Sequence, residues 1–407
     1  MSKQVMKISL QQAKYLILKE QGLITSPFDK GKKGALAVIE HLGYLQIDTL
    51  NVVTRAHHHT LWSRLPDYKE SFLNELLEKD KQIFEYWSHA ASYLPMVDFR
   101  FSLPRKKLYA SGKSHWFAQD KKMNKYVLDR IRAEGPLQSK NFEFKRDAPG
   151  NWYNWKPAKR ALEQLFMEGK LMVAKRHNFQ KIYDLAERVV PSTVDTSFPS
   201  NKEYADYMIR KMIHANGMAT ITEISYLRAG LKEIIAKEVK RMLKTGELVE
   251  ISVETLKGTY LTTPHQLNRL QTQTQKNRQN AKNSTLHLLS PFDNLIIQRK
   301  RLNAFFQFDY TIECYLPERK RKFGYWCLPV LYNNDFVARY DAKADRVTGE
   351  YYIKSMHFEK NFSPNEGFNL WFMEKTKAFA AFNGCTKIII QKADNAQWKR
   401  QINTFLK

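Results

Sequence analysis

The chain has 407 residues, with 66 lysines and arginines against 41 aspartates and glutamates, which gives a formal net charge of +25 at pH 7. This length exceeds what one hydrophobic core organises, so we expect two to four domains that need no disulfide or metal to fold. An excess of positive charge this large, in a chain of otherwise ordinary composition, indicates nucleic acid as the partner but selects no chemistry.

The cysteines and the N-terminal segment exclude several classes. Cys314, Cys327 and Cys385 are far apart in the sequence and form no Cys-x-x-Cys pair, so neither a zinc finger nor an iron–sulfur site is indicated. Lys14 and Lys19 lie where a signal peptide needs its apolar stretch, and no run reaches the length of a membrane span. We therefore expect a cytoplasmic, nucleoid-associated protein with a reducing environment.

The first predicted elements are helices. Residues 9–21 begin with the N-cap Ser9, carry one apolar stripe and end at Gly22. Residues 35–45 and 69–78 show the same helical spacing of apolar side chains. Residues 83–94 are rich in aromatic side chains and are expected to cover the pocket side of this first unit.

The polar pair Gln46 and Asp48 follows the second helix, with Ile47 between them. If residues 45–49 are extended, Gln46 and Asp48 point the same way and Ile47 points into the fold. A carboxylate and an amide would then share one pocket. The alternative is that Asp48 caps the next turn while Gln46 is a solvated helix end.

Cationic and aromatic residues come next in the chain: Arg55, His57, His58, His59, Trp62 and Arg64. All suit contacts with phosphates and bases, so an acid beside a DNA-binding surface is the hypothesis. Three consecutive histidines cannot all face one metal ion from a regular helix or strand. We therefore favour DNA contact or packing over a metal site and predict no cofactor.

The middle of the chain uses one pattern twice, in residues 126–185 and 203–261. Each copy reads as helices, a Gly that ends the last helix, and a β-prone hairpin, which is typical of a winged helix or of another helix–hairpin unit. The predicted recognition helix of the first copy starts with Trp155, Lys156, Lys159 and Arg160, a mixture that fits backbone contact and base stacking. The tryptophans are equally suited to packing in a core.

The last third changes in character. Residues 265–285 are polar without a sustained apolar stripe, which favours a linker over a solvated helix. Short β-prone runs at 311–316, 323–331, 336–341 and 351–358 then predict a small antiparallel barrel or sandwich, followed by a helix at 369–382 and a strand at 387–391. Two basic clusters accompany these strands: Arg299, Lys300 and Arg301, and, at a predicted hairpin tip, Arg319, Lys320, Arg321 and Lys322.

These elements predict an α+β fold of tandem winged-helix units followed by a small antiparallel β-barrel and a C-terminal helix. The predicted boundaries are 1–115 for a first winged-helix unit with the Gln-Ile-Asp segment, 116–196 for a second and 197–264 for a third. A linker at 265–285 and the barrel with its helix at 286–407 complete the chain.

Four ordered stretches resemble one family. GYLQIDTLNVVTRAHHHTLWSRL, FEYWSHAASYLP, NWYNWKPAKRALEQLF with NFQKIYDLAERV, and LLSPFDNLI with RKR and FDYTIECYLPERKRKFGYWCLPVL are similar to the YcaQ-type winged-helix DNA glycosylases, also called the AlkX/AlkZ family. The resemblance implies three winged-helix units packed with a β-barrel around a basic channel. It also implies release of alkylated guanine and unhooking of interstrand crosslinks. The family's Gln–apolar–Asp motif falls on Gln46, Ile47 and Asp48, whereas Ile297 and Gln298 depart from the Trp-Asp of many relatives.

The chemistry of such a substrate suits these side chains. Alkylation at N7 makes guanine a good leaving group, so what remains is to stabilise an oxocarbenium-like sugar and place a water. Asp48 can do both, and Gln46 can hold the water because an amide both donates and accepts. No nearby lysine is an obvious Schiff-base former, which predicts a monofunctional glycosylase acting as a monomer on double-stranded DNA.

Two other classes remain open. A non-enzymatic winged-helix transcriptional regulator explains the charge and the repeated units, although it needs no Gln46–Asp48 pocket. A structure-specific nuclease is weaker, because no acidic cluster has metal-ligand spacing. The preferred adduct, base flipping and the source of damage are not readable from the sequence.

Overall fold

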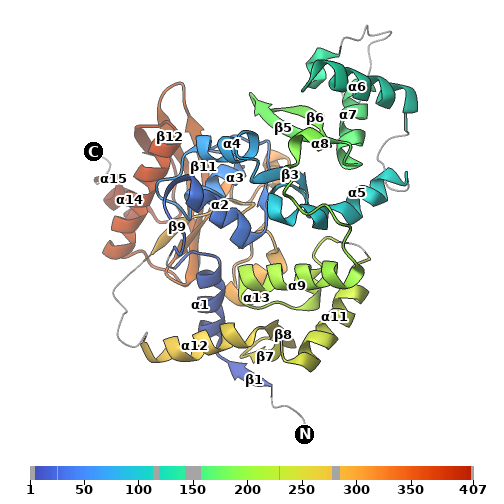
Figure 1. The fold of residues 1–407 in the computed structure, drawn as a ribbon. Coiled ribbons are helices and arrows are strands. Elements are labelled where there is room, and N and C mark those ends of the chain that lie inside the picture. Colours follow the sequence, from blue (N-terminus) through green and yellow to red (C-terminus); the bar gives the residue numbers. More distant parts are fainter. Residues whose placement is uncertain are drawn as a thin grey trace. The chain divides into compact units, whose positions relative to one another are not determined.

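The chain forms two compact units in this computed structural model, which describes residues 5–24, 26–112, 119–142, 157–228, 230–276 and 285–404 (Figure 1). Unit 1 comprises Met1–Asp29, Leu45–Asp67 and Met208–Lys407, and unit 2 comprises Lys30–Tyr44 and Tyr68–Tyr207. Neither unit is continuous in sequence, and the segment predicted as the first unit, 1–115, is divided between them. The five-part domain division remains a prediction. In the described ranges, no helix is both long and apolar enough to cross a membrane.

Unit 1 holds most of the strands. Its elements are β1 (Met6–Ile8), α1 (Leu10–Glu20), β2 (Leu45–Gln46), α3 (Ala56–Trp62), α10 (Ile221–Ile224), α11 (Lys232–Thr245), β7 (Val249–Val253), β8 (Thr259–Thr262), α12 (Pro264–Lys276), β9 (Leu286–Leu288), α13 (Arg299–Phe306), the 3-10 turn η3 (Glu318–Lys320), β10 (Cys327–Tyr332), β11 (Asp335–Asp345), β12 (Glu350–Phe358), α14 (Glu366–Phe382), β13 (Lys387–Ile390) and α15 (Ala396–Thr404). The helix α9 (Asn201–Asn216) contains the division between Tyr207 and Met208.

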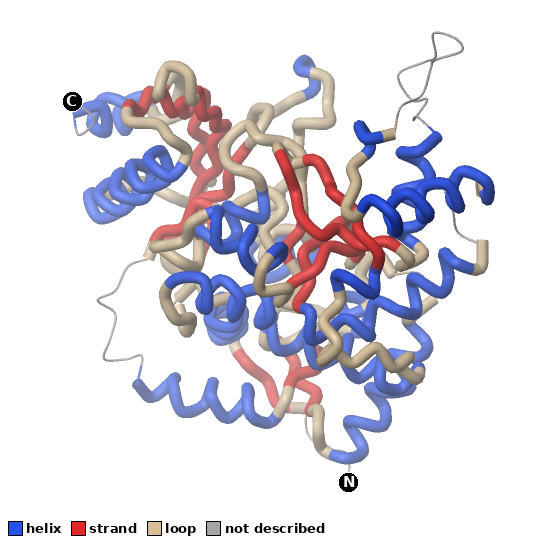
Figure 2. Tube along the Cα trace, turned by 45° about the horizontal axis from the view of Figure 1, so that its top comes forward, coloured by secondary structure: helices blue, strands red, loops and turns tan. Residues whose placement is uncertain are grey.

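A five-stranded sheet in the order β13-β12-β11-β10-β9 forms the centre of unit 1. The strands from β9 to β12 are antiparallel, whereas β13 runs parallel to β12. The helix α14 runs beside the sheet (Figures 1 and 2), because Phe368, Phe372 and Phe379 lie on one face of the helix and join the apolar cluster of the strands. The predicted α+β class is confirmed. Among the described residues, the first and last strands of this sheet are not hydrogen-bonded to each other, so the predicted antiparallel barrel is not confirmed.

A three-stranded sheet β1-β7-β8 gathers the other helices of unit 1. β1 pairs in parallel with β7, which brings the N-terminal strand to a hairpin nearly 250 residues later, as in the pair Ile8 and Val253. The predicted cap of α1 is confirmed: Ser9 Oγ accepts from the N–H of Gln12, and Gln12 Oε1 accepts from the N–H of Ser9.

Three expectations for unit 1 are wrong. Residues 311–316 form no strand, so the cations at 319–322 do not cap a hairpin; they belong to a loop that contains η3. The segment predicted as a linker, 265–285, forms α12 over Pro264–Lys276, while 277–284 lie outside the described residues. The polar composition favoured a linker because the segment lacks a strong apolar stripe. Leu270 and Gln266 are nevertheless buried, at 4% and 5% exposure, and hold the helix, so the alternative of a helix is correct for Pro264–Lys276.

Unit 2 is mainly helical. Its elements are α2 (Gly31–Leu42), α4 (Glu70–Glu78), β3 (Ile83–Trp87), β4 (Ala91–Pro95), η1 (Met96–Ser102), α5 (Leu103–Ala110), α6 (Lys121–Glu134), η2 (Ser139–Asn141), α7 (Pro157–Met167), the hairpin β5 (Leu171–His177) and β6 (Gln180–Leu185), and α8 (Ala186–Val189). β3 and β4 pair antiparallel, as do β5 and β6. The predicted order of helices followed by a hairpin is therefore present in 121–185, and again in 201–262.

One charged group lies inside the apolar core of unit 2. The side chain of Lys106 is buried, and its Nζ lies 3.9 Å from the ring centre of Phe99, 4.9 Å from Tyr86 and 5.6 Å from Phe84. Burial lowers the pKa of Lys106 to about 7. The aromatic faces stabilise the ammonium, but they replace water only in part.

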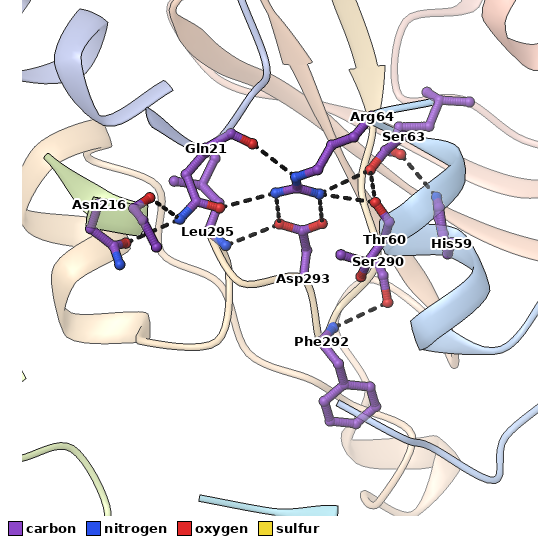
Figure 3. A network of polar contacts seen from close by, with 12 residues as sticks. Gln21, His59, Thr60, Ser63, Arg64, Asn216, Ser290, Phe292, Asp293 and Leu295 are labelled. Atoms are coloured by element: carbon purple, nitrogen blue, oxygen red, sulfur yellow. Dashed lines mark hydrogen bonds and ion pairs between the residues drawn. The ribbon is translucent and has the colours of Figure 1, made fainter. Parts of the chain in front are cut away.

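A fully buried ion pair holds the three segments of unit 1 together (Figure 3). Arg64 donates from Nη1 to Asp293 Oδ2 at 2.7 Å and from Nη2 to Asp293 Oδ1 at 3.0 Å, and both side chains are 0% exposed. Its remaining N–H groups reach the backbone oxygen of Gln21 at 2.8 Å and Gln21 Oε1 at 3.0 Å, and the backbone oxygen of Thr60 at 3.1 Å. Gln21 in turn donates to the oxygen of Ala215 at 2.8 Å. Asp293 also accepts the N–H of Leu295 at 3.0 Å, so both side chains that bind Arg64 make further hydrogen bonds.

We predict that Asp293→Ala lowers the free energy of unfolding by about 3–5 kcal/mol, because it leaves the Arg64 guanidinium buried without its counter-ion. Urea denaturation measures the change. The double variant Arg64→Met, Asp293→Leu removes both charges and should recover a large part of the loss. The control is Asp335→Ala, which breaks the exposed pair with Lys14 and should change stability by less than about 1 kcal/mol. Equal effects of Asp293→Ala and Asp335→Ala would contradict the role of the buried pair.

A second prediction concerns Lys106. The pKa of Lys106 in the folded protein lies below its value in the unfolded chain, so protonation of this lysine destabilises the fold. This loss of folding free energy is absent above pH 10.5, grows as the pH falls and is complete below about pH 7. Lys106→Met should therefore raise the free energy of unfolding by about 4 kcal/mol at pH 7 but only about 1 kcal/mol at pH 10. Lys107→Met, at the neighbouring exposed position, is the matched control for adding a methionine to this helix. A gain independent of pH would assign the effect to packing.

Candidate active site and nucleic-acid interface

The candidate acid Asp48 lies in unit 1, in the extended connection between β2 and α3. The strand predicted over 45–49 is confirmed only at Leu45–Gln46, and Ile47 is half-buried rather than buried. Asp48 is 8% exposed, and its Oδ1 accepts a hydrogen bond from the N–H of Leu50 at 2.9 Å. The alternative that Asp48 caps a turn is thus partly right, since this is the geometry of an Asx turn. The bond engages one of two carboxylate oxygens and fixes the orientation of the group.

Burial sets the electrostatics of this carboxylate. It raises the pKa of Asp48, while the bond from Leu50 and the positive charge of Arg55 act in the opposite direction. Arg55 is half-buried at the N-terminus of α3. Burial therefore disfavours the ionised form of Asp48, whereas the N–H of Leu50 and the charge of Arg55 favour it.

The charge of Asp48 acts on a second segment of unit 1. Partial burial and then the charge of Asp48 raise the pKa of Cys314, and they do the same for Tyr315. Leu50, whose N–H binds Asp48, and Cys314 both pack against the same apolar cluster of unit 1. The loop that carries the cations 319–322 therefore starts on the core that also supports the segment of the candidate acid. This shared core could not be predicted from sequence, because more than 260 residues separate Asp48 from Cys314.

Four residues predicted to contact DNA are buried instead. His57, His58 and His59 are 1%, 7% and 1% exposed, and Arg64 is fully engaged by Asp293 and Gln21. Burial lowers the pKa of His58 to about 3 and of His59 to about 4, so neither carries charge at neutral pH. His59 also contacts the oxygen of Leu288 through Nε2 at 2.9 Å. A buried side chain cannot reach a phosphate, so these four residues have packing roles here.

The residues of the basic cluster at 299–301 differ in their exposure to solvent. Arg301 is buried and lies 3.0 Å from Glu223. Arg299 is half-buried over the ring of Tyr310, and its Nη2 donates to the oxygen of Pro291 at 2.6 Å. Only Lys300 is exposed. Arg301 is therefore withdrawn from the predicted DNA-binding set.

The loop at 313–324 keeps its cations in solvent. Arg319, Lys320 and Lys322 are exposed, and Arg321 is half-buried with its Nε donating to the oxygen of Leu316 at 2.9 Å. These four side chains lie in the loop that the charge of Asp48 reaches. Arg55, which also belongs to the predicted DNA-binding set, acts directly on Asp48 through its charge.

The remaining predicted residues belong to unit 2. Lys159 and Arg160 are exposed in the first turns of α7. Trp155 and Lys156 lie outside the described residues. Their contact with DNA remains a prediction.

Sequence reasoning missed two acids that organise this site. Asp293 and Glu313 are both buried, and each accepts backbone N–H groups of its own loop. Asp293 accepts that of Leu295, and Glu313 accepts those of Phe323 and Gly324. An acid between apolar residues, as in Pro-Phe-Asp-Asn-Leu at 291–295, was the available signal. Within the described ranges, no group of three or more His, Cys, Asp or Glu side chains is arranged to hold a metal ion.

Comparison with known proteins decides the family. The model for "DNA glycosylase AlkZ-like" proteins matches residues 39–371. The chain belongs to the AlkZ-like DNA glycosylase family. It is therefore a DNA glycosylase, an enzyme of DNA repair whose substrate is DNA. The match begins before Gln46 and includes the loop at 313–324.

The fold of this AlkZ-like glycosylase agrees with a solved structure. It is similar to the Streptomyces sahachiroi DNA glycosylase AlkZ, with a TM-score of 0.63 and 16% sequence identity, over 95% of this chain and 100% of that one. At this identity the similarity shows a common fold. Residue roles in the AlkZ-like chain therefore rest on its own geometry.

We predict that neutralising the loop of this glycosylase weakens DNA binding. Replacing Arg319, Lys320 and Lys322 together by Ala should raise the Kd for duplex DNA and reduce the slope of log K against log salt by about 0.9 for each lost phosphate contact. Fluorescence anisotropy from 50 to 200 mM salt measures both. The control replaces Lys377 and Arg400, exposed cations on α14 and α15, by Ala. An unchanged slope in the loop variant would show its cations to be ordinary solvated surface.

Proposed function

We propose that this glycosylase hydrolyses the N-glycosidic bond of N7-alkylguanine in double-stranded DNA and unhooks interstrand crosslinks formed through that position. It does so as a monofunctional enzyme and as a monomer, acting on nucleoid DNA. Asp48 and Gln46 carry the chemistry. The Gln–apolar–Asp branch of the family is part of this proposal, with Gln46, Ile47 and Asp48 as its motif.

The leaving group of this substrate needs little help from the enzyme. N7-alkylated guanine carries a formal positive charge, so departure of the base neutralises it and needs no strong general acid. The sugar becomes oxocarbenium-like as the bond breaks. A carboxylate close to it stabilises that charge and accepts a proton from the attacking water.

The observation that carries the proposal is the state of Asp48. Its Oδ1 is fixed by the N–H of Leu50, and burial leaves its negative charge poorly solvated. A poorly solvated carboxylate attracts a nearby cationic sugar more strongly than one in water does. Oδ2 is assigned to the water, and the half-buried Gln46 in the preceding strand is assigned to its orientation.

The DNA-binding framework we propose is winged-helix in type. In α9, α10, α11 and the hairpin β7–β8, helices precede a two-stranded antiparallel wing, and α6, α7 and β5–β6 repeat that order. The basic loop at 313–324 contributes phosphate contacts next to Asp48. A transcriptional regulator would use similar helices and wings, but the family assignment favours the enzyme.

We predict that Asp48→Asn lowers the single-turnover rate of N7-methylguanine release by about a hundredfold to ten-thousandfold while duplex affinity stays the same. The measurement is free base released from methylated and from crosslinked duplexes, compared with wild type. The variant should be no less stable than wild type at pH 7, because the raised pKa of Asp48 means that its ionised form destabilises the fold above that pKa. Retained turnover would move the chemistry to another residue.

The pH profile gives an independent readout of the same acid. Only ionised Asp48 is active, so base release should fall as the pH drops through its raised pKa, at a higher pH than an ordinary Asp would give. Arg55→Ala removes a charge that lowers this pKa and should move the acid limb to still higher pH. Arg55→Lys keeps the charge and serves as the matched control. If Arg55→Ala leaves the acid limb of the pH profile unchanged, that limb does not report the ionisation of Asp48.

A further inference from the structure

We propose that Tyr315 is a base-stacking residue of this glycosylase, which places its ring against a DNA base at the lesion from a loop that is fixed before DNA binds. The proposal deepens the proposed function and rests on it, since it takes the Asp48 site as the place where the damaged nucleotide lies. Nothing in the chemistry assigned to Asp48 and Gln46 uses this side chain.

The first support is the exposure of the ring. Tyr315 is 70% exposed, more than Phe198 or Tyr126, which are the other exposed aromatic side chains among the described residues. A large aromatic ring in water makes little contribution to folding. On a positively charged surface it provides a face on which any base can stack, whatever its sequence.

The second support is its position. Tyr315 belongs to the same unit as Asp48, and its neighbour Cys314 packs against the same apolar cluster as Leu50, whose N–H binds Asp48. The charge of Asp48 also contributes to the raised pKa of Tyr315. The nucleotide whose glycosidic bond faces Asp48 would therefore lie within reach of this loop. A crosslinked guanine cannot rotate freely into a closed pocket, so an open stacking face suits such a substrate.

The third support is the rigidity of the loop. The buried carboxylate of Glu313 accepts three successive backbone N–H groups, from Lys322 at 3.1 Å, Phe323 at 2.8 Å and Gly324 at 3.1 Å. The backbone oxygen of Glu313 also accepts from the N–H of Leu316 at 2.9 Å. Both ends of the loop are thus bound to one residue, with Tyr315 between them.

Two further contacts fix the far end of the loop. Gly324 has a φ of +146°, and a Cβ there would lie 2.5 Å from Asp341 Cγ, so only glycine fits. Asp341 accepts the N–H of Trp326 at 2.8 Å, which connects the loop to β11. The ring of Tyr315 therefore meets DNA from a preformed position, and little entropy is lost on ordering it.

The cations of the loop complete the argument. Arg319, Lys320 and Lys322 are exposed a few residues after Tyr315 and can contact phosphates while the ring contacts a base. Aromatic and cationic side chains so arranged are typical of surfaces that bind unstacked nucleotides. The same loop thus supplies both kinds of contact.

The test uses the full-length protein and a duplex that cannot be hydrolysed. A 2′-fluoro N7-methylguanine duplex with 2-aminopurine beside the lesion reports affinity and stacking together. Tyr315→Ala should weaken binding by roughly tenfold to a hundredfold and remove the emission change that wild type produces. Tyr315→Phe and Tyr315→Trp keep the ring and should retain both. Leu370→Ala, which truncates an exposed apolar side chain of α14, is the matched control.

Two results would overturn the proposal. Wild-type affinity and emission in Tyr315→Ala would show that the ring contacts no base. A Phe variant as weak as the Ala variant would assign the effect to the hydroxyl group instead of stacking. Failure of the proposed function gives a different result: Asp48→Asn would then release base normally from a hydrolysable duplex, while the Tyr315 outcome on the 2′-fluoro duplex would be unaffected.

Discussion

The buried pair of Arg64 and Asp293 is the interaction on which unit 1 depends. It joins the end of α1, the end of α3 and the turn after β9, which come from all three sequence segments of the unit. The candidate acid, between β2 and α3, belongs to the same sequence segment as Arg64. The helix α3 before Arg64 is enclosed on all its faces, since every residue from Ala56 to Leu61 is buried, and its histidines therefore lie inside the unit. A charged residue expected at the DNA surface thus turns out to organise the interior.

The parts of the structure that were predictable from sequence are those determined by local patterns. Ser9 with Gln12 predicts the start of α1 correctly, and Gly followed by β-prone residues predicts both hairpins. Predictions failed where distant residues decide. Leu270 holds α12 in a segment whose composition resembles a linker, and Glu313 bends a β-prone segment into a loop. A run of histidines and arginines at 55–64 reads as a nucleic-acid surface because charge is visible in a sequence while the burying partners, Leu288 and Asp293, are not.

The site that results combines two opposite conditions. Asp48 is removed from water, which makes its charge costly and effective, whereas the cations around the loop at 313–324 remain solvated. A carboxylate fully exposed among those cations would be screened by them. A carboxylate sealed in the core would never meet a nucleotide. Burial raises the pKa of Asp48, the bond from Leu50 and the charge of Arg55 lower it, and the same bond fixes the orientation of the carboxylate.

The order of the segments in the chain has a consequence for synthesis. Arg64 and its carboxylate partner are 229 positions apart, and unit 2 is encoded almost entirely between them. At about 5–20 residues per second, Arg64 is synthesised roughly ten to fifty seconds before Asp293. During that interval the helical unit can fold by itself, whereas the segment carrying Asp48 has no completed sheet to pack on. The segment that carries Asp48 can therefore complete its packing in unit 1 only after Asp293 has been made.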